Sequence, residues 1–183
     1  MRSKRSVPVL MAFVVLALFV AGCAGTAGSA KPLTAAAKPE LLAQYTKIGL
    51  ATSAQGDASK MTAADRERIA DLVARKVKER APNRFADFAA TTTDAETLHV
   101  TIAFTRYDEG SAFARFMLAG LGQIHVDAEV TLEDRALQTV IGKFEVTKTF
   151  AWGGIYGGGT GIKDVEDGFA EAVAKVVLGQ PSE

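Results

Sequence analysis

The chain has 183 residues, and its 21 basic and 21 acidic side chains give a formal net charge of zero. This balance lacks the excess of Lys and Arg that a phosphate backbone requires, so nucleic acid is excluded as an expected partner. A single cysteine excludes an intramolecular disulfide.

Residues 1–22 have the order of a secretory leader. An uncharged apolar run over residues 7–20 follows three basic residues, and the small pair Ala21-Gly22 ends the segment. The run is shorter than the roughly 20 apolar residues of a membrane-spanning helix, and it contains a proline. This pattern favours a leader that is removed after export.

Residues 20–23, Val-Ala-Gly-Cys, resemble the lipobox of bacterial lipoproteins. The resemblance implies signal cleavage between Gly22 and Cys23 and fatty acylation of the Cys23 thiol. Two or more acyl chains hold a protein firmly at a membrane, whereas one chain binds only marginally. Ala24 stands where many such proteins carry the aspartate that retains them in the inner membrane. We therefore expect an outer-membrane lipoprotein that faces the periplasm.

The mature chain divides into a tether and one domain. Residues 24–39 are small and polar and bury too little apolar surface to order themselves, so we expect a flexible tether over residues 23–39. Without the leader the chain carries 18 basic and 21 acidic side chains, a net charge of −3. Residues 40–183 form a single domain of ordinary size that needs no disulfide.

The first half of the domain predicts a strand, a helix and a second strand. A short apolar run over residues 45–52 ends at a glycine-containing breaker, as strands often do. A pattern typical of an N-terminal helix cap begins at Thr62, and apolar residues recur at helical spacing from there to Pro82. Strict alternation over residues 97–105 predicts a half-buried strand.

The second half of the domain predicts a hairpin and a last helix. Residues 124–133 and 139–150 each alternate between apolar and polar side chains, and the polar turn between them joins antiparallel strands. Asp164 can cap an amphipathic helix that ends at Gly179.

The element order β-α-β-β-β-α predicts an α+β fold. We expect a two-layer sandwich in which a mostly antiparallel sheet of about four strands carries both helices on one face. The opposite face of the sheet is then polar and open.

Two segments differ from plain connections. Residues 106–122 are rich in apolar side chains, which indicates either a helix folded onto the core or an exposed patch that meets lipid, a partner or a second copy. The glycine-rich residues 151–161 lack nucleotide-binding spacing. They predict either a mobile loop that presents aromatic side chains to a partner or one whose aromatics cover the sheet edge. The predicted partner-binding residues are Phe113, Phe116, Met117, Leu118, Leu121, Trp152 and Tyr156.

A metal site could be drawn through His99, His125, Asp127 and Glu129, which the alternation places on one polar face of the sheet. Cross-strand polar pairing explains the same residues, because no tight spacing such as His-x-x-x-His supports a site. We predict no metal and no cofactor. The serines lack a nucleophile-elbow context and an acylated Cys23 leaves no thiol, so we predict no enzymatic activity.

Several motifs of the chain are shared with a known family. They are Arg-Tyr-Asp-Glu-Gly-Ser at 106–111, Ala-Arg-Phe at 114–116, Ala-Gly-Leu-Gly at 119–122, Val-Asp-Ala-Glu-Val at 126–130 and the glycine-rich residues 152–161. With these motifs, residues 45–178 resemble the bacterial lipoproteins of domain-of-unknown-function family 4410, to which no activity is assigned. The layout is also similar to small periplasmic lipoproteins that assist cell-wall synthases or exopolysaccharide export, a likeness of fold alone.

Our leading hypothesis is a non-enzymatic envelope lipoprotein that acts as an accessory or interaction module. It docks through residues 113–121 and 152–156 onto another envelope protein or onto copies of itself. The alternative is a periplasmic binding module for a small or lipidic ligand held between the two segments.

Overall fold

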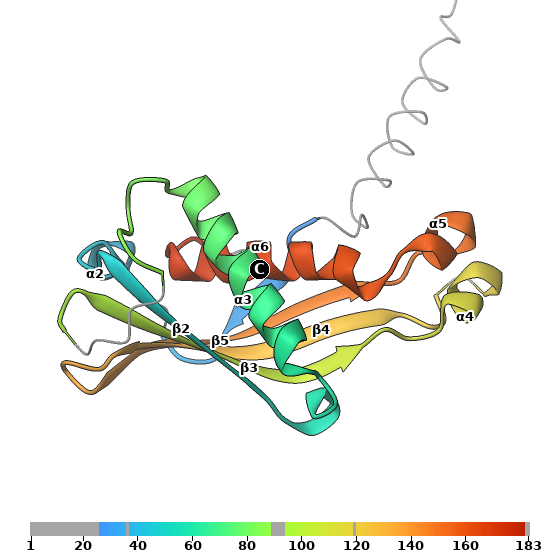
Figure 1. Cartoon of the computed structure of the whole chain (residues 1–183), viewed down its shortest axis with the longest axis horizontal. Coiled ribbons are helices and arrows are strands. Elements are labelled where there is room, and N and C mark those ends of the chain that lie inside the picture. The colour runs from blue at the N-terminus through green and yellow to red at the C-terminus, as the bar shows by residue number, and fades with distance from the viewer. Residues whose placement is uncertain (1–25, 36, 89–93, 119, 182–183) are drawn as a thin grey trace, which may run out of the picture.

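The computed structural model describes residues 26–35, 37–88, 94–118 and 120–181. The predicted leader, its cleavage site at Gly22 and the acylation site Cys23 lie outside these residues. The elements (Figure 1) are β1 (Ser29–Pro32), α2 (Pro39–Leu42), β2 (Lys47–Ala54), a 3₁₀ turn (Gly56–Ala58), α3 (Ala63–Arg80), β3 (Thr97–Asp108), α4 (Ala112–Met117), β4 (Ile124–Asp134), β5 (Thr139–Phe150), α5 (Gly154–Gly159) and α6 (Ile162–Val177).

The strands form one mixed sheet in the order β1-β5-β4-β3-β2 over the described part of the chain. Strand β2 pairs parallel with β3, and the other three pairs are antiparallel. Strands β2 and β3 are parallel because α3 connects them. The helix crosses over the sheet and brings the chain back to the end where β2 began, so β3 runs in the same direction as β2. The predicted α+β class is confirmed, but the predicted count of about four strands is too low.

Helices α3 and α6 lie together across one face of the sheet (Figure 1), as the sequence predicted. The inward side chains of β3, β4 and β5 meet the apolar stripes of these helices in one core. Its largest fully buried apolar residues are Tyr45, Phe104, Phe144, Phe150, Phe169, Leu42, Ile48, Ile69, Leu98, Ile102 and Ile124. None of the helices within the described residues combines the length and the apolar character needed to cross a bilayer.

Helix α3 begins with the predicted capping pattern. The Asp65 amide donates to Thr62 Oγ1 at 3.1 Å, and the Thr62 amide donates to Asp65 Oδ2 at 3.1 Å. These reciprocal bonds satisfy two amides that a helix start otherwise leaves unpaired. The predicted last helix is also confirmed, and Asp164 accepts the Gly161 amide at 2.8 Å.

Strand β1 corrects the predicted tether. Residues 29–32 pair antiparallel with β5, so the prediction of a flexible segment over 23–39 is wrong for this stretch. Main-chain hydrogen bonds to a sheet edge do not need an apolar pattern, and Ala30 is the one β1 side chain that is buried. Residues 29–32 show no alternation of apolar and polar side chains, because Pro32 and polar residues are tolerated on an edge strand.

Gly28 sets the entry of the chain into β1. Its amide donates to the Gly168 carbonyl of α6 at 2.8 Å, and an added Cβ would lie 2.5 Å from the Thr147 carbonyl oxygen. No side chain fits this approach between β5 and α6 without a shift of main chain.

We predict that Gly28→Ala lowers the free energy of unfolding by roughly 1–3 kcal/mol, because overpacking at a backbone contact forces the strand away. Urea denaturation measures the change. Gly159→Ala is the matched control, since a Cβ at Gly159 meets nothing within 4 Å. Equal stability of the two variants would contradict the close approach of residue 28.

Candidate functional site: an apolar tip held by a buried arginine

Helices α4 and α5 lie side by side at one end of the sheet (Figure 1). Helix α4 follows β3, and α5 follows β5, so two distant parts of the sequence meet there. We call residues 112–118, 120–121 and 152–160 the apolar tip. Its members include every residue that the sequence predicted to bind a partner.

The apolar tip exposes large side chains to solvent. Phe113 is 74% exposed and Ile155 is 86% exposed. The exposed large apolar residues of the tip are Phe113, Phe116, Met117, Leu118, Leu121, Ile155 and Tyr156. Trp152 is half-buried and meets the Tyr156 ring edge-on, with 6.3 Å between ring centroids. The structure thus brings the two predicted segments together, and it adds Ile155, which the sequence analysis did not select.

Arg115 holds the apolar tip together from inside. Its side chain is 1% exposed, and its guanidinium donates to four main-chain carbonyls. Nη1 donates to Glu109 at 2.7 Å and to Gly122 at 2.6 Å, on either side of α4. Nε donates to Gly157 at 2.9 Å and Nη2 donates to Thr160 at 3.0 Å, both near the end of α5. A buried guanidinium therefore joins α4 to α5 through charge-assisted hydrogen bonds.

Close packing completes the joint between α4 and α5. A Cβ at Gly158 would lie 3.0 Å from the Phe116 Cβ, and a Cβ at Gly157 would collide with the Trp152 carbonyl. The predicted mobile loop is wrong for residues 154–159, which are helical. Glycine is a poor helix former, but here it permits the close approach of α4. The Gly157 and Thr160 carbonyls are available to Arg115 because they lie at the C-terminal end of α5.

The surface of the apolar tip is uncharged. Residues 110–123 contain one charged side chain, the buried Arg115, and residues 150–162 contain none. The tip therefore combines exposed apolar side chains with a charge that is enclosed by carbonyl dipoles. Such a surface is suited to contact with an apolar partner.

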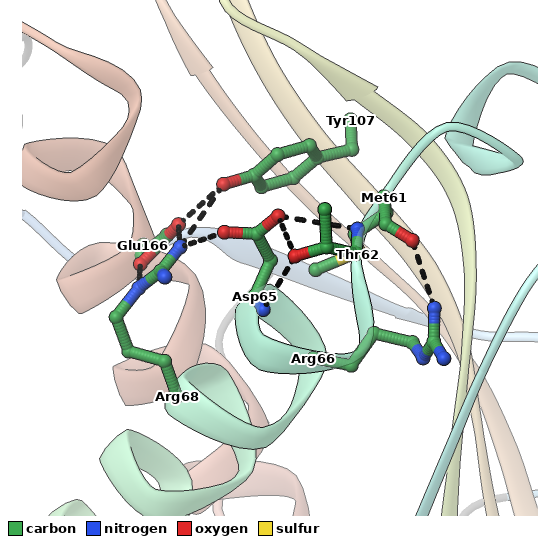
Figure 2. A network of polar contacts seen from close by, with 7 residues as sticks. All are labelled: Met61, Thr62, Asp65, Arg66, Arg68, Tyr107 and Glu166. Atoms are coloured by element: carbon green, nitrogen blue, oxygen red, sulfur yellow. Dashed lines mark hydrogen bonds and ion pairs between the residues drawn. The ribbon is translucent and has the colours of Figure 1, made fainter.

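A second polar cluster lies between α3, α6 and β3 (Figure 2). Arg68 donates two hydrogen bonds to the fully buried Glu166, from Nε at 2.9 Å and from Nη2 at 2.7 Å. The Tyr107 hydroxyl donates to Glu166 at 2.6 Å, and Arg68 also contacts Asp65 at 2.8 Å. The cluster therefore connects two helices to the sheet.

The cluster favours one fixed charge state. Burial and the hydrogen bond to Glu166 raise the pKa of Tyr107 above that of an exposed tyrosine. The hydrogen bond to Glu166 raises the pKa of Arg68, and hydrogen bonds from Thr62 and Arg68 lower the pKa of Asp65. Both carboxylate oxygens of Glu166 accept hydrogen bonds from Arg68, and one also accepts from the Tyr107 hydroxyl. The arrangement is that of a structural ion pair.

The structure separates the two histidines of the metal site considered from the sequence. His99 of β3 lies opposite Glu133, whereas His125 of β4 lies opposite Asp108, which is nine residues from His99 along β3. That spacing is about 30 Å at 3.3 Å per residue. His99 is 4% exposed, which corrects its predicted place on a wet face. Within the described residues, no three metal-binding side chains converge.

Asp127 and His125 remain close on the open face. Burial raises the pKa of Asp127, and burial together with the Arg106 charge lowers the pKa of His125. Thr149 Oγ1 lies 3.1 Å from His125 Nδ1. His125 and Asp127 of β4 therefore form a polar patch with Thr149 of the neighbouring strand β5.

Arg115, Arg68 and Glu166 are not among the site residues predicted from the sequence. Arg115 carried a signal, because it is the one charge in an apolar segment. Glu166 carried another, because it lies one turn from Ile162 and from Phe169 on the apolar stripe of α6. Such a lone charge among apolar residues indicates a buried pair or a buried cap.

Comparison with known proteins places the chain in a family. A family model described as a domain of unknown function (DUF4410) matches residues 30–154. The chain belongs to the DUF4410 family. This confirms the resemblance drawn from the motifs at 106–111 and 126–130. A search of curated proteins found no match.

The DUF4410 fold also occurs in solved structures. Two structures of the PelC dodecamer from Paraburkholderia phytofirmans, one a single-residue variant, match with TM-scores of 0.52. They are 15% and 17% identical to this chain, and each match covers 85% of this chain and 99% of the PelC chain. At that identity the likeness shows the fold alone.

Replacement of Arg115 tests the joint of the apolar tip. We predict that Arg115→Lys lowers the free energy of unfolding by about 3 kcal/mol, because each buried carbonyl left without a donor costs about 1–3 kcal/mol. A lysine keeps the charge but cannot reach carbonyls in both helices. Urea denaturation measures the loss, and hydrogen exchange should show faster opening at residues 154–160. Unchanged exchange there would refute the bracing role.

Replacement of Tyr107 tests the charge state of the polar cluster. An unfolded tyrosine ionises near pH 10, whereas the folded Tyr107 keeps its proton to higher pH. Unfolding then releases a proton above about pH 10, so the stability contributed by Tyr107 is present below that pH and is lost as pH rises. We predict that the free energy of unfolding of Tyr107→Phe, measured by urea denaturation, falls less steeply with pH above about pH 10. Identical pH dependence of the two proteins would contradict the raised pKa.

Proposed function

We propose that this chain is a non-enzymatic interaction module of the bacterial envelope that docks through its apolar tip. The observation that carries the proposal is the group of seven exposed large apolar side chains on one braced structure. Exposed apolar side chains gathered in one patch mark interaction sites, whereas single ones need no explanation. Arg115 holds the surface in shape before a partner arrives, which reduces the entropy that docking costs.

The module is held at the membrane by a lipid on Cys23, after cleavage between Gly22 and Cys23. The basic leader, the short apolar run and the Val-Ala-Gly-Cys motif support this assignment. Ala24 favours the outer membrane, where the domain faces the periplasm. No metal or cofactor enters the proposal.

The proposed role is contact and not turnover. The charged groups best placed for catalysis, Arg68 and Glu166, neutralise each other between α3 and α6. His99 lies near the start of β3, and His125 of β4 lies opposite Asp108 at the other end of β3. A catalytic site needs two titratable groups with access to one cleft, and these pairs do not supply it.

The partner is another envelope protein or a second copy of the chain. The fold likeness to a PelC dodecamer supports self-association, because it shows that a domain of this layout is compatible with a closed assembly. The direct contact of α4 with α5 favours docking over a ligand held between them.

Crosslinking in native membranes tests the proposal. We expect species larger than the monomer for the full chain, and a reduced yield for the double variant Phe113→Ser/Ile155→Ser, which loses apolar docking surface. Leu137→Ser is the matched control, because Leu137 is 70% exposed at the opposite end of the sheet. Mass analysis of the mature chain should find an acylated Cys23 at its start. An unmodified sulfur, an uncut leader or monomer alone would refute the proposal.

A further inference from the structure

The start of the described chain lies close to the apolar tip. Strand β1 runs antiparallel to β5 with Ser29 opposite Thr147, so lower residue numbers in β1 lie toward the end of β5 that leads into the tip. Lys148 Nζ donates to Thr26 Oγ1 at 2.9 Å, and Gly28 is bonded to α6. Thr26 is therefore held within reach of the Lys148 side chain, near the end of β5.

The position of Thr26 limits where the acylated residue can be. Cys23 precedes Thr26 by three residues, which span at most about 11 Å when fully extended. The opposite end of β5, at Thr139, lies eight residues from Thr147, or about 26 Å along the strand. The anchor is thus confined to the half of the domain that carries the apolar tip.

The tip has the chemistry of a membrane-interface surface. Phenylalanine, leucine, isoleucine and methionine side chains project from it, and Trp152 and Tyr156 lie at its base and flank. Aromatic residues of this kind favour the boundary between headgroups and acyl chains. The single charge within the tip residues, on Arg115, is already enclosed by carbonyls, so insertion would not require this charge to leave water.

We infer that the apolar tip inserts into the same bilayer that holds the acyl chains of Cys23. The inference rests on one part of the proposed function, the acylated Cys23, and differs in another, because it names lipid in place of a protein as the occupant of the apolar tip. The anchor and the tip then act as two membrane signals at one end of the domain. Two such signals bind far more firmly than one, and together they fix the orientation of the domain.

The chain carries its own probe for this inference. Trp152 is the single tryptophan of the sequence and belongs to the tip. The acylated full chain is reconstituted into vesicles of phosphatidylethanolamine and phosphatidylglycerol, with or without brominated acyl chains that quench tryptophan fluorescence on contact. We expect brominated vesicles to quench Trp152. The double variant Phe113→Ser/Ile155→Ser should lose most of this quenching, although its acyl anchor keeps it on the vesicle.

Two controls separate insertion from mere proximity. Leu137→Ser should leave the quenching of Trp152 unchanged. In Trp152→Phe/Leu137→Trp the probe moves to the far end of the sheet, and its fluorescence should not be quenched. Circular dichroism confirms that each variant is folded, as expected for substitutions at residues 113, 137 and 155, which are exposed.

The outcomes distinguish the inference from the proposed function. Unquenched Trp152 in a vesicle-bound chain would overturn the inference. If crosslinking in native membranes still yields larger species, and their yield falls in Phe113→Ser/Ile155→Ser, the tip docks on protein and the proposed function stands. An unmodified Cys23 would overturn both.

Discussion

The guanidinium of Arg115 is enclosed by protein and donates to carbonyls on both sides of α4 and in the last turn of α5. A buried cation is costly unless it is fully hydrogen-bonded, and here main-chain dipoles supply that satisfaction. The two short helices could not hold their positions by helix propensity, because α5 is mostly glycine. The exposed side chains of the tip therefore owe their common orientation to a residue that no partner touches.

A second constraint lies at the edge of the sheet. Strand β1 adds few apolar contacts, yet its pairing with β5 and the bond from Gly28 to α6 fix where the N-terminal segment leaves the domain. Together with Arg115, this edge makes one end of the molecule both the exit of the chain and the site of the exposed apolar residues. The polar cluster of Arg68 and Glu166 holds the helical layer in place behind it.

The elements with a regular pattern of apolar residues could be predicted from the sequence. Elements that depend on contacts with distant residues could not. Strict alternation identified β3, β4 and β5, and the Thr62 cap located α3. Strand β1 was not predicted, because main-chain pairing on a sheet edge requires no hydrophobic period. Helix α5 was not predicted, because its helical state depends on packing and not on helix propensity. The tip residues were selected from composition alone. Their assembly around Arg115 depends on contacts between residues 42 and 45 positions apart, which no local window contains.

The direction of β1 also gives the domain a polarity. If the chain is held at Cys23, each copy in one leaflet has the same orientation, with the turn after β4 pointing away from the bilayer and the strands rising from it. Neighbouring copies in one leaflet then stand with their flanks toward one another, where β1 and β2 are the edge strands of the described sheet. Under this anchoring, the exposed apolar residues of the tip lie at the end of each copy nearest the bilayer and the β4–β5 turn lies at the other end, so a partner can distinguish the two ends of the domain.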